Sequence, residues 1–195
     1  MSNRAQTGKL RRELRFSKSA IEANLRELGK ELSQVRPLVD AFMDSDGLLT
    51  LYGSELLLLE KALGIGFGEP AVQLVGELVS VKSVPPGTGI SYGYLAKTEQ
   101  PTNLGLVAIG FSDGIPRVAT NQVSVVIDNK SFRSIGRIAM DQLVVDLQDL
   151  VPELGAEVEL FTHHFPLSEW SRVTGFTQLE ILGRITARVE RTWAE

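Results

Sequence analysis

The apolar residues near the start of the chain recur at helical spacing, and this pattern predicts an amphipathic helix. The helix is expected to begin near Ser19, because Glu22 three residues later completes a capping-box pattern. Its apolar face consists of Ile21, Leu25, Leu28, Leu32 and Val35. Residues 1–13 are mostly polar, so we expect them to be mobile and ordered structure to begin near Leu14.

Two shorter segments follow before the pattern changes. Pro37 is expected to stop or re-aim the helix, and the apolar run 37–43 then predicts a strand followed by a turn at 44–47. A second helix is predicted from Ser54 to Leu63. Four successive leucines surround this helix instead of forming one stripe, and Gly64 suits its C-terminal cap.

From residue 72 onwards, short apolar segments alternate with turn residues, which is typical of an all-β module. The expected strands cover 72–84, 106–110, 123–127, 132–140, 143–147 and 157–161. A hairpin turn is predicted at 128–130, a loop at 152–155 and a short helix at 168–174. The predicted fold class is therefore α+β, with a short helical N-terminal region (1–70) followed by a Greek-key or barrel-like β-domain (71–195).

The composition is that of an ordinary globular protein, with 43% hydrophobic and 23% charged residues among 195. The formal net charge of -4 gives no electrostatic footprint for nucleic acid, so we expect no nucleic-acid partner. Lys9, Arg11, Arg12 and Arg15 form a small basic patch near the start of the chain, and its simplest explanation is a solvated tail.

The residue types also exclude several kinds of site. The absence of cysteine excludes a disulfide framework and a thiol nucleophile, and makes the cytoplasm the expected location. The apolar run at 56–59 is flanked by charges and is far shorter than the roughly 20 residues that span a bilayer, and no signal peptide is visible. We therefore expect no membrane partner. His163 and His164 are sequence neighbours that rarely converge on one ion, so no metal site is predicted.

Three runs in the β-rich part carry the candidate chemistry. Ser-Tyr-Gly at 91–93 places Tyr92 just past a glycine-bearing turn, where a side chain can project and a ligand can approach the backbone. The second run, Gly-Phe-Ser-Asp-Gly-Ile-Pro-Arg, occupies 110–117, and the third, Gly-Arg-Ile-Ala-Met-Asp-Gln, occupies 136–142.

The third run also has a purely structural explanation. It is a plausible strand and turn, in which Met140 fills the core and Asp141 is a turn residue. Taken alone, this explanation is favoured over a functional one. The functional reading therefore depends on all three runs together.

The order and spacing of the three runs resemble the C-terminal β-domain of alanine racemases, the fold-type III enzymes that use pyridoxal phosphate. The resemblance covers roughly Val72 to Trp193. It implies that Tyr92 is an acid/base catalyst, contributed across a dimer to the active site of the other subunit. It also implies that the other residues of these runs face the substrate or line its entrance, namely Met140, Asp141, Arg137, Arg117 and Phe111.

Two residues depart from the family pattern. Phe111 stands where the family usually has an entrance tyrosine, and Leu179 stands where a family tyrosine helps to hold the cofactor phosphate. Each departure removes a hydroxyl group, so each one weakens the resemblance at the level of chemistry.

The resemblance also implies a second catalytic group that this sequence does not supply. Racemisation needs acid/base groups on both faces of the substrate carbon, and in the family one of them is a lysine that carries the cofactor. That lysine belongs to a β/α barrel, for which 195 residues leave no room. Residues 19–26 resemble the opening helix of the barrel, and Asp40 falls at the lysine position. We therefore expect no cofactor on this chain alone.

Three hypotheses follow for function. The first is a racemase-like module with no catalysis of its own, which dimerises or docks on a full-length racemase. The second is that the chain supplies Tyr92 in trans to a pyridoxal phosphate site on a barrel-bearing partner. The third is a shortened gene product with no selected function. Oligomerisation is expected under the first two, and the leucine-rich helix around 56–59 favours a homodimer.

Overall fold

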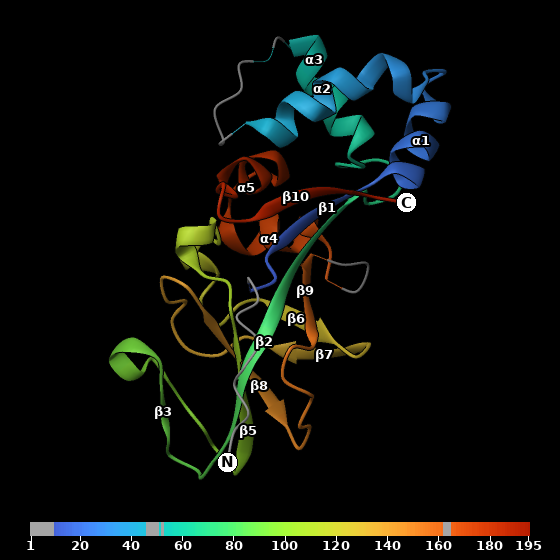
Figure 1. Cartoon of the computed structure of the whole chain (residues 1–195). Helices are drawn as coiled ribbons and strands as arrows, with labels where there is room; N and C mark the ends of the chain where they lie inside the picture. The colour runs from blue at the N-terminus through green and yellow to red at the C-terminus, as the bar shows by residue number, and fades with distance from the viewer. Residues whose placement is uncertain (1–9, 46–50, 52, 162–164) are drawn as a thin grey trace.

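The computed structural model describes residues 10–45, 51, 53–161 and 165–195 (Figure 1). The expectation of mobility for residues 1–9, the predicted turn at 46–47 and the two histidines at 163 and 164 lie outside these residues. Within them, no helix is both long and apolar enough to cross a membrane.

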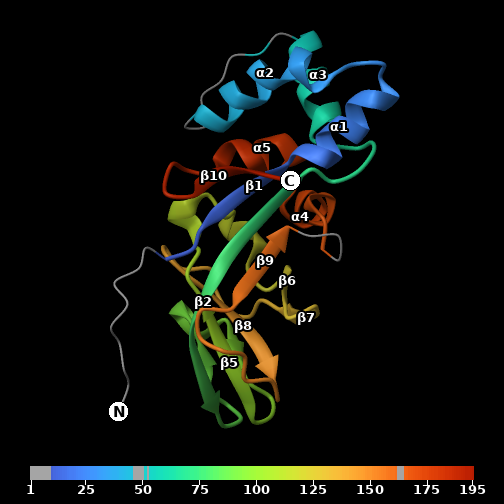
Figure 2. The same ribbon diagram turned by 45° about the vertical axis from the view of Figure 1, so that its right-hand side comes forward.

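The described residues form a mixed α+β fold, as predicted, with one large sheet and helices packed at one end of it (Figures 1 and 2). Its strands are β1 (Glu13–Ser17), β2 (Val72–Val84), β5 (Thr102–Val107), β6 (Ser124–Ile127), β7 (Lys130–Arg133), β8 (Leu143–Gln148), β9 (Glu157–Phe161) and β10 (Glu190–Ala194). A separate two-stranded sheet consists of β3 (Gly89–Ile90) and β4 (Ala96–Lys97).

Strand β2 organises the large sheet because it pairs with three neighbours. Its first half lies between β1 and β9, and its second half pairs with β5, which in turn pairs with β8. A register shift between Leu78 and Ser80 separates the two halves and lets the strand change partners. Along the other path the order continues from β9 through β6 to β7.

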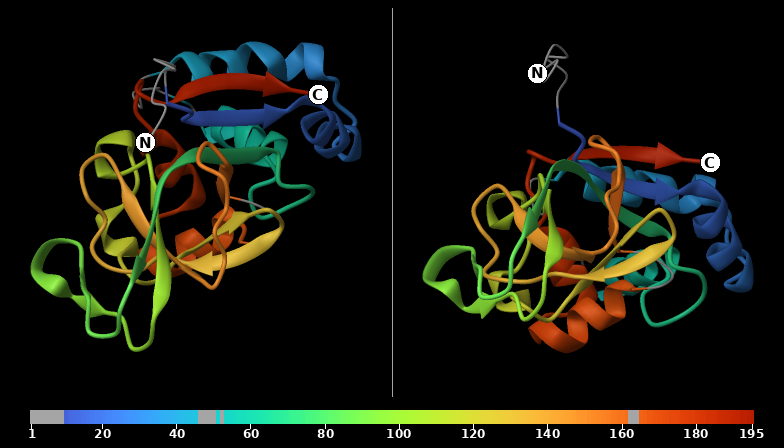
Figure 3. Two further views of the ribbon diagram at one scale, coloured as in Figure 1. Left: turned by 60° about the horizontal axis from the view of Figure 1, so that its bottom comes forward. Right: turned by 90° about the horizontal axis from the view of Figure 1, so that it is seen from below.

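The two ends of this strand order approach each other without forming a closed barrel. Ser134, just after β7, makes an isolated antiparallel bridge to Val145 of β8, and no continuous strand pair joins β7 to β8. Seen from below, the strands curve around a shared interior (Figure 3). The barrel-like expectation therefore holds for the curvature of the sheet but not for its closure.

The N-terminal region is helical, but it is divided differently from the prediction. It contains α1 (Lys18–Glu27), α2 (Leu32–Asp44) and α3 (Gly53–Ala62). The single helix predicted across 19–35 is wrong, because Gly29 has a φ of 64° and ends α1. Gly29 and Lys30 donate backbone hydrogen bonds to Arg26 and Leu25, which is the Schellman arrangement. The N-cap is Ser17, not Ser19, and its hydroxyl accepts from the backbone of Ala20.

The strand predicted at 37–43 is also wrong, because these residues lie inside α2. Pro37 occupies the middle of that helix, where a proline usually costs about 3 kcal/mol. Val35, Val39 and Phe42 are buried on one face of α2, so tertiary packing offsets the cost of Pro37. The helix predicted at 54–63 is confirmed as α3.

Strand β1 joins the N-terminal region to the β-rich part. It lies between β2, to which it is antiparallel, and β10, to which it is parallel. The first strand thus begins at Glu13, close to the predicted start near Leu14, and the described arginines of the basic patch pair with carboxylates instead of forming a solvated tail. Arg15 forms ion pairs with Glu13 and Glu157, and these raise the pKa of Arg15.

The chain end is tied to the helices through Trp193 of β10. Its indole nitrogen donates a hydrogen bond of 3.1 Å to Asp40, and the guanidinium of Arg36 stacks 5.1 Å from the ring centroid. Phe16 of β1 packs against the same indole ring. Asp40, predicted at the lysine position of a strand, is thus a helix residue held by Arg36 and Trp193.

Most of the β-rich prediction is confirmed, with two errors in boundary, but the strands β3, β4 and β10 were not predicted. Strand β7 ends at Arg133 instead of continuing to Met140, because Gly136 has a φ of 82° and turns the chain. The strand predicted at 106–110 is β5, which lies earlier, at 102–107. The hairpin turn at 128–130 and the helix α4 (Leu167–Thr174) are as predicted, and α5 (Gln178–Arg184) was not predicted.

Candidate functional site

A hairpin projects from the body of the protein (Figures 1 and 3), and Tyr92 lies in the turn that connects its two strands. The hairpin consists of β3, a 3₁₀ turn η1 (Tyr92–Tyr94), and β4. Tyr92 is 73% exposed and Tyr94 is 68% exposed, and Leu95 next to them is also exposed. Because these aromatic side chains are exposed, they are available to a ligand or partner.

The hairpin tip owes its shape to backbone conformations that most residues avoid. Ser91, Gly93 and Tyr94 all have positive φ values, of 58°, 76° and 48°. The ring of Tyr94 lies over Gly89, where a β-carbon would collide with it. The hydroxyl of Ser91 donates a 2.5 Å hydrogen bond to the carbonyl of Arg137, which ties the hairpin to the third sequence run.

A cleft of about 560 Å³ lies beside the hairpin tip and brings the predicted site residues together. It is lined by Tyr92, Phe111, Arg117, Arg137, Ile138, Ala139, Met140, Asp141 and Gln142. All six residues that the sequence singled out are among them. The structure thereby places the three separate runs around one surface cavity, although the role of each residue stays a prediction.

Backbone hydrogen bonds hold the second and third runs together. Phe111 and Ser112, in the 3₁₀ turn η2 (Phe111–Asp113), donate to the carbonyls of Ala139 and Met140 at 3.0 and 2.9 Å. The hydroxyl of Ser112 donates to the same Met140 carbonyl at 2.6 Å. Met140 is 56% exposed and is therefore not the core residue that the structural explanation of this run requires.

A buried carboxylate lies under these turns. Asp113 has no exposed surface, and its Oδ2 accepts a hydrogen bond of 2.8 Å from the backbone of Gly110. Its Oδ1 accepts no hydrogen bond and is balanced by charge, with Arg188 at 3.2 Å and Arg12 at 3.7 Å. Burying this charge is tolerable because two guanidinium groups compensate it.

Asp141 is the exposed counterpart of this buried group. Its Oδ1 accepts a 2.6 Å hydrogen bond from Arg188 and lies 3.0 Å from the hydroxyl of Ser112. The hydrogen bond from Arg188, followed by that from Ser112, lowers the pKa of Asp141, and the pKa of Arg188 is raised in turn. Asp141 is therefore ionised at neutral pH with its charge already matched.

The remaining charge of the cleft is positive. Arg117, at the start of η3 (Arg117–Ala119), stacks over the ring of Phe111 at 5.1 Å. Arg137 lies beside Gly93 in the hairpin tip. Within the described part of the chain, neither guanidinium forms an ion pair. The cleft thus combines two uncompensated cations with a phenol and an exposed thioether, a surface suited to an anionic group.

Sequence reasoning missed the residues that support the cleft from behind. Asp113 was visible as part of a turn motif, but nothing in the sequence indicated its burial. Arg12 and Arg188 lie about a hundred and seventy residues apart and meet at Asp113 only in the folded chain. No local signal could have identified such a pair.

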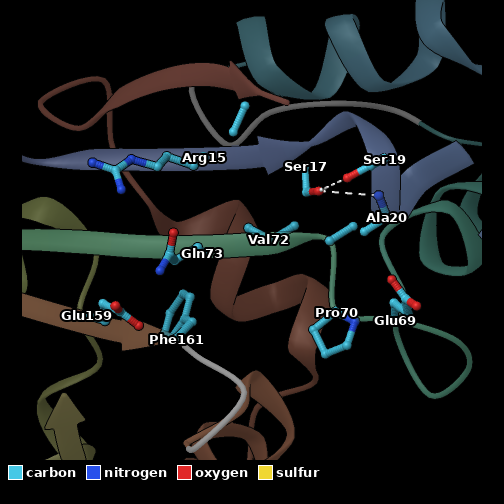
Figure 4. Close-up of a pocket in the computed structure, with 12 residues that line it drawn as sticks. Arg15, Ser17, Ser19, Ala20, Glu69, Pro70, Val72, Gln73, Glu159 and Phe161 are labelled. Atoms are coloured by element: carbon cyan, nitrogen blue, oxygen red, sulfur yellow. Dashed lines mark hydrogen bonds between the residues drawn. The ribbon is translucent and has the colours of Figure 1, made fainter. Parts of the chain in front are cut away.

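A second hollow contains none of the six predicted site residues (Figure 4). Strands β1, β2 and β9 form its walls, with Arg15, Gln73 and Glu159 pointing into it. Ser17, at its far end, accepts the capping hydrogen bond from Ala20. Its polar groups belong largely to the structural network of the sheet, so we do not assign it a ligand.

The residues of the cleft do not fit pyridoxal phosphate. The cofactor needs a lysine to hold its aldehyde carbon, and none of the nine lining residues is a lysine. Leu179 of α5 has no hydroxyl to offer a phosphate and packs against the core. Within the described residues there is also no group of three or more metal-binding side chains. No catalytic step through the cofactor follows from this chain.

Comparison with known proteins identifies the fold. Residues 71–193 match the family described as alanine racemase, C-terminal domain. This match covers more than half of the chain, which therefore belongs to the alanine racemase family through its C-terminal domain. The same range contains the hairpin and both turns of the cleft, so the predicted resemblance is confirmed.

The relatives are much longer proteins. Alanine racemase from Streptomyces coelicolor is 44% identical over 128 residues, which are 64% of this chain and 33% of that protein. The solved structure of alanine racemase from Streptomyces coelicolor A3(2) has a TM-score of 0.63 at 41% identity, and covers 69% of this chain and 36% of that chain. Alanine racemase from Bartonella henselae, solved with covalently bound pyridoxal phosphate, gives 0.62 at 29% identity, with 65% and 36% covered. The chain thus spans about a third of the length of these relatives.

Proposed function

We propose that this chain is a racemase-like module without catalysis of its own, which docks its cleft face on a barrel-bearing alanine racemase or on a second copy of itself. The observation that carries the proposal is the exposed apolar surface around the cleft. Two of its large side chains, Tyr92 and Met140, line the cleft, and Tyr94, Leu95 and Val118 follow cleft residues closely in the sequence. Each of the five is about half exposed or more. Such a gathering on one face of a soluble protein marks an interaction site.

Charge complementarity favours a partner with carboxylates at the contact. Arg117 and Arg137 bring two positive charges to the face, and Asp141 is already paired with Arg188. A symmetric dimer that placed this surface directly on itself would bring like charges together. The barrel of a full-length racemase is therefore favoured over a second copy. The exposed Leu56 and Leu57 of α3 offer a different surface for self-association.

The residues of the cleft support the proposal that the chain has no catalysis of its own. Moving a proton from one face of a carbon to the other needs two acid/base groups on opposite sides. Tyr92 supplies one candidate, and the lining residues include no lysine to supply the second. Incubation with pyridoxal phosphate, borohydride reduction and mass spectrometry should show no lysine labelled in preference to the others. Preferential labelling together with alanine racemisation would overturn this part of the proposal.

Docking is tested by light scattering and titration with a full-length alanine racemase. We expect a complex with the racemase, and we expect Tyr94→Ser with Leu95→Ser to weaken it at least about tenfold. Val151→Ser with Leu154→Ser is the matched control, because these side chains are similarly exposed but lie outside the cleft face. Equal loss in both pairs of variants, or no complex with wild type, would contradict the proposal.

A second candidate function is supported by the position of Tyr92. Its phenol projects from the hairpin tip beside Arg137, where it could complete a pyridoxal phosphate site of a partner in trans. The test mixes the chain with a full-length racemase whose Ser-Tyr-Gly tyrosine has been replaced by phenylalanine. Restored racemisation that Tyr92→Phe abolishes and Tyr94→Phe retains is expected. If docking occurs without restored activity, the module acts through contact alone.

A further inference from the structure

Arg188 lies where three parts of the chain meet, and each of its nitrogens has a different partner. Nε lies 3.2 Å from Oδ1 of Asp113, Nη1 donates to the hydroxyl of Ser112 at 2.5 Å, and Nη2 donates to Asp141 at 2.6 Å. We infer that Arg188 is a positioning residue, which fixes Met140 and Asp141 at the cleft. The inference deepens the proposed function and rests on it for its importance to a partner.

The anchored end of this arrangement is rigid because it is buried. Asp113 has no exposed surface and is held by the backbone of Gly110 and by the charge of Arg12. Arg12 is fixed in turn, since its Nε donates a 2.6 Å hydrogen bond to the carbonyl of Ala108. Arg188 therefore extends from an immobile carboxylate towards an exposed one, so that a buried group orients a surface turn.

The exposed end of the Arg188 side chain is linked to both Asp141 and Met140. Asp141 is bound directly, and Met140 is reached through Ser112, whose hydroxyl accepts from Arg188 and donates to the Met140 carbonyl. Thr186, two residues before Arg188, adds hydrogen bonds to the backbones of Ser112 and Asp113. The segment after α5 thus braces the whole turn.

Arginine is suited to this task and lysine is not. A guanidinium presents its donors in one plane at fixed angles, so it can meet three partners at once without further loss of side-chain freedom. An ammonium group at position 188 would keep the charge but could not contact all three partners at the same time. Arg188→Lys therefore separates positioning from charge.

The test uses nuclear magnetic resonance on the whole chain. The chain has three methionines, so methyl-labelled methionine gives a signal for Met140 and an internal reference from Met43, which packs against the core. In Arg188→Leu, which adds no further methionine signal, we expect the Asp141 carboxyl pKa to rise towards its ordinary value and the Met140 methyl signal to shift. In Arg188→Lys we expect the Met140 signal to shift while the rise of the pKa is smaller. The Met43 signal should stay in place.

Arg172→Leu is the matched control, because Arg172 is an exposed arginine of α4 that pairs with Glu169 away from the cleft. It should change neither the Asp141 pKa nor the Met140 signal. A folded Arg188→Leu protein with an unchanged Asp141 pKa and an unchanged Met140 signal would overturn the inference. If Arg188→Leu fails to fold, Ser112→Ala provides the test, because it removes the hydroxyl link between Arg188 and Met140 but keeps both ion pairs and the backbone hydrogen bond from residue 112 to the Met140 carbonyl. An unmoved Met140 signal in Ser112→Ala would also overturn it.

The importance for function is measured separately. If wild type restores activity to the tyrosine-deficient racemase, Arg188→Lys should reduce the restored kcat on the order of 10- to 100-fold while docking affinity changes little. Unchanged kcat in Arg188→Lys would count against a positioning role at the reacting atoms. If wild type restores nothing, the trans-completion function fails, and the resonance measurements still decide whether Arg188 positions the turn.

Discussion

The turn that carries Met140 and the hairpin that carries Tyr92 line the same cleft, yet they are held in opposite ways. The turn is bound by backbone hydrogen bonds to Phe111 and Ser112, and by Arg188 to a fully buried carboxylate. The hairpin forms its own two-stranded sheet and leaves both tyrosines about 70% exposed. The Met140 wall of the cleft is thus held in place by contacts within the chain, whereas the side chains of the hairpin wall are free to contact a second molecule.

This contrast explains why the chain can retain site geometry without retaining a complete site. Buried charge and close backbone contact fix a surface irrespective of any ligand. An exposed aromatic tip becomes ordered against what it binds, and binding must then offset the lost conformational freedom. We therefore expect substitutions at the turn to change stability and substitutions at the hairpin tip to change docking.

The largest expected effect comes from removing the buried charge under the turn. Asp113→Asn keeps an acceptor for Gly110 but leaves the buried side of the network without its charge, so that Arg12 loses its carboxylate partner and Arg188 keeps only Asp141. This should cost about 3 kcal/mol in the free energy of unfolding. Urea unfolding measures this loss. Asp141→Asn is the control, because the exposed partner should contribute far less. Equal losses for the two substitutions would remove the distinction between the buried and exposed ends of the network.

The close approach of the two turns predicts the next effect. A β-carbon at Gly110 would collide with backbone atoms of Ala139, Met140 and Gln142, so Gly110→Ala should destabilise the protein by about 2 kcal/mol. Gly183→Ala in α5 is the matched control, since a β-carbon there meets no atom within 4 Å. It should stabilise the helix by about 0.5–1 kcal/mol. Thermal unfolding of both variants gives the comparison, and a tolerated Gly110→Ala would contradict the tight packing.

A smaller effect is expected at the base of the hairpin. The hydroxyl of buried Thr98 donates to the carbonyl of Pro85 at 2.7 Å and accepts from the backbone of Thr88 at 3.0 Å. Thr98→Val leaves both groups without this partner and should cost about 1 kcal/mol. Hydrogen exchange should accelerate in the hairpin more than in β2. Uniform acceleration would mean that the hairpin unfolds only with the rest of the protein.

The smallest effect is expected at the tip itself. Tyr92 is 73% exposed, so Tyr92→Phe should change the free energy of unfolding by less than about 0.5 kcal/mol. Denaturant unfolding of this variant beside wild type is sufficient to check it. A loss well above 1 kcal/mol would show that the phenol has a structural role, and its retention would then say nothing about chemistry.

The sequence by itself predicted six residues that line the cleft, and it predicted most of the strands. The motif order placed Tyr92, Phe111 and Met140 in one family pattern, and the fold brings all six predicted residues to one cleft. The turn at 128–130 was predictable because its residues favour positive φ, and Asp128 and Asn129 adopt it. These features depend on residues that are close together in the sequence, so the sequence pattern was sufficient to predict them.

Helix boundaries near the start were not determined by local pattern. The apolar spacing from Ile21 to Val35 stays in phase across the break at Gly29, so a single helix fitted the pattern equally well. The conformation of Pro37 was also misjudged, because its local cost is outweighed by the burial of Val39 and Phe42, which only packing reveals.

Only the tertiary structure decided how the cleft is supported. Arg12 and Arg188 come from opposite ends of the chain and meet at Asp113 because β1 inserts between β2 and β10. Ion pairs between such distant residues leave no periodic or local signature in a sequence. Short sequence motifs thus predicted which residues line the cleft. What holds these residues in place is the burial of charged groups that come from distant parts of the chain.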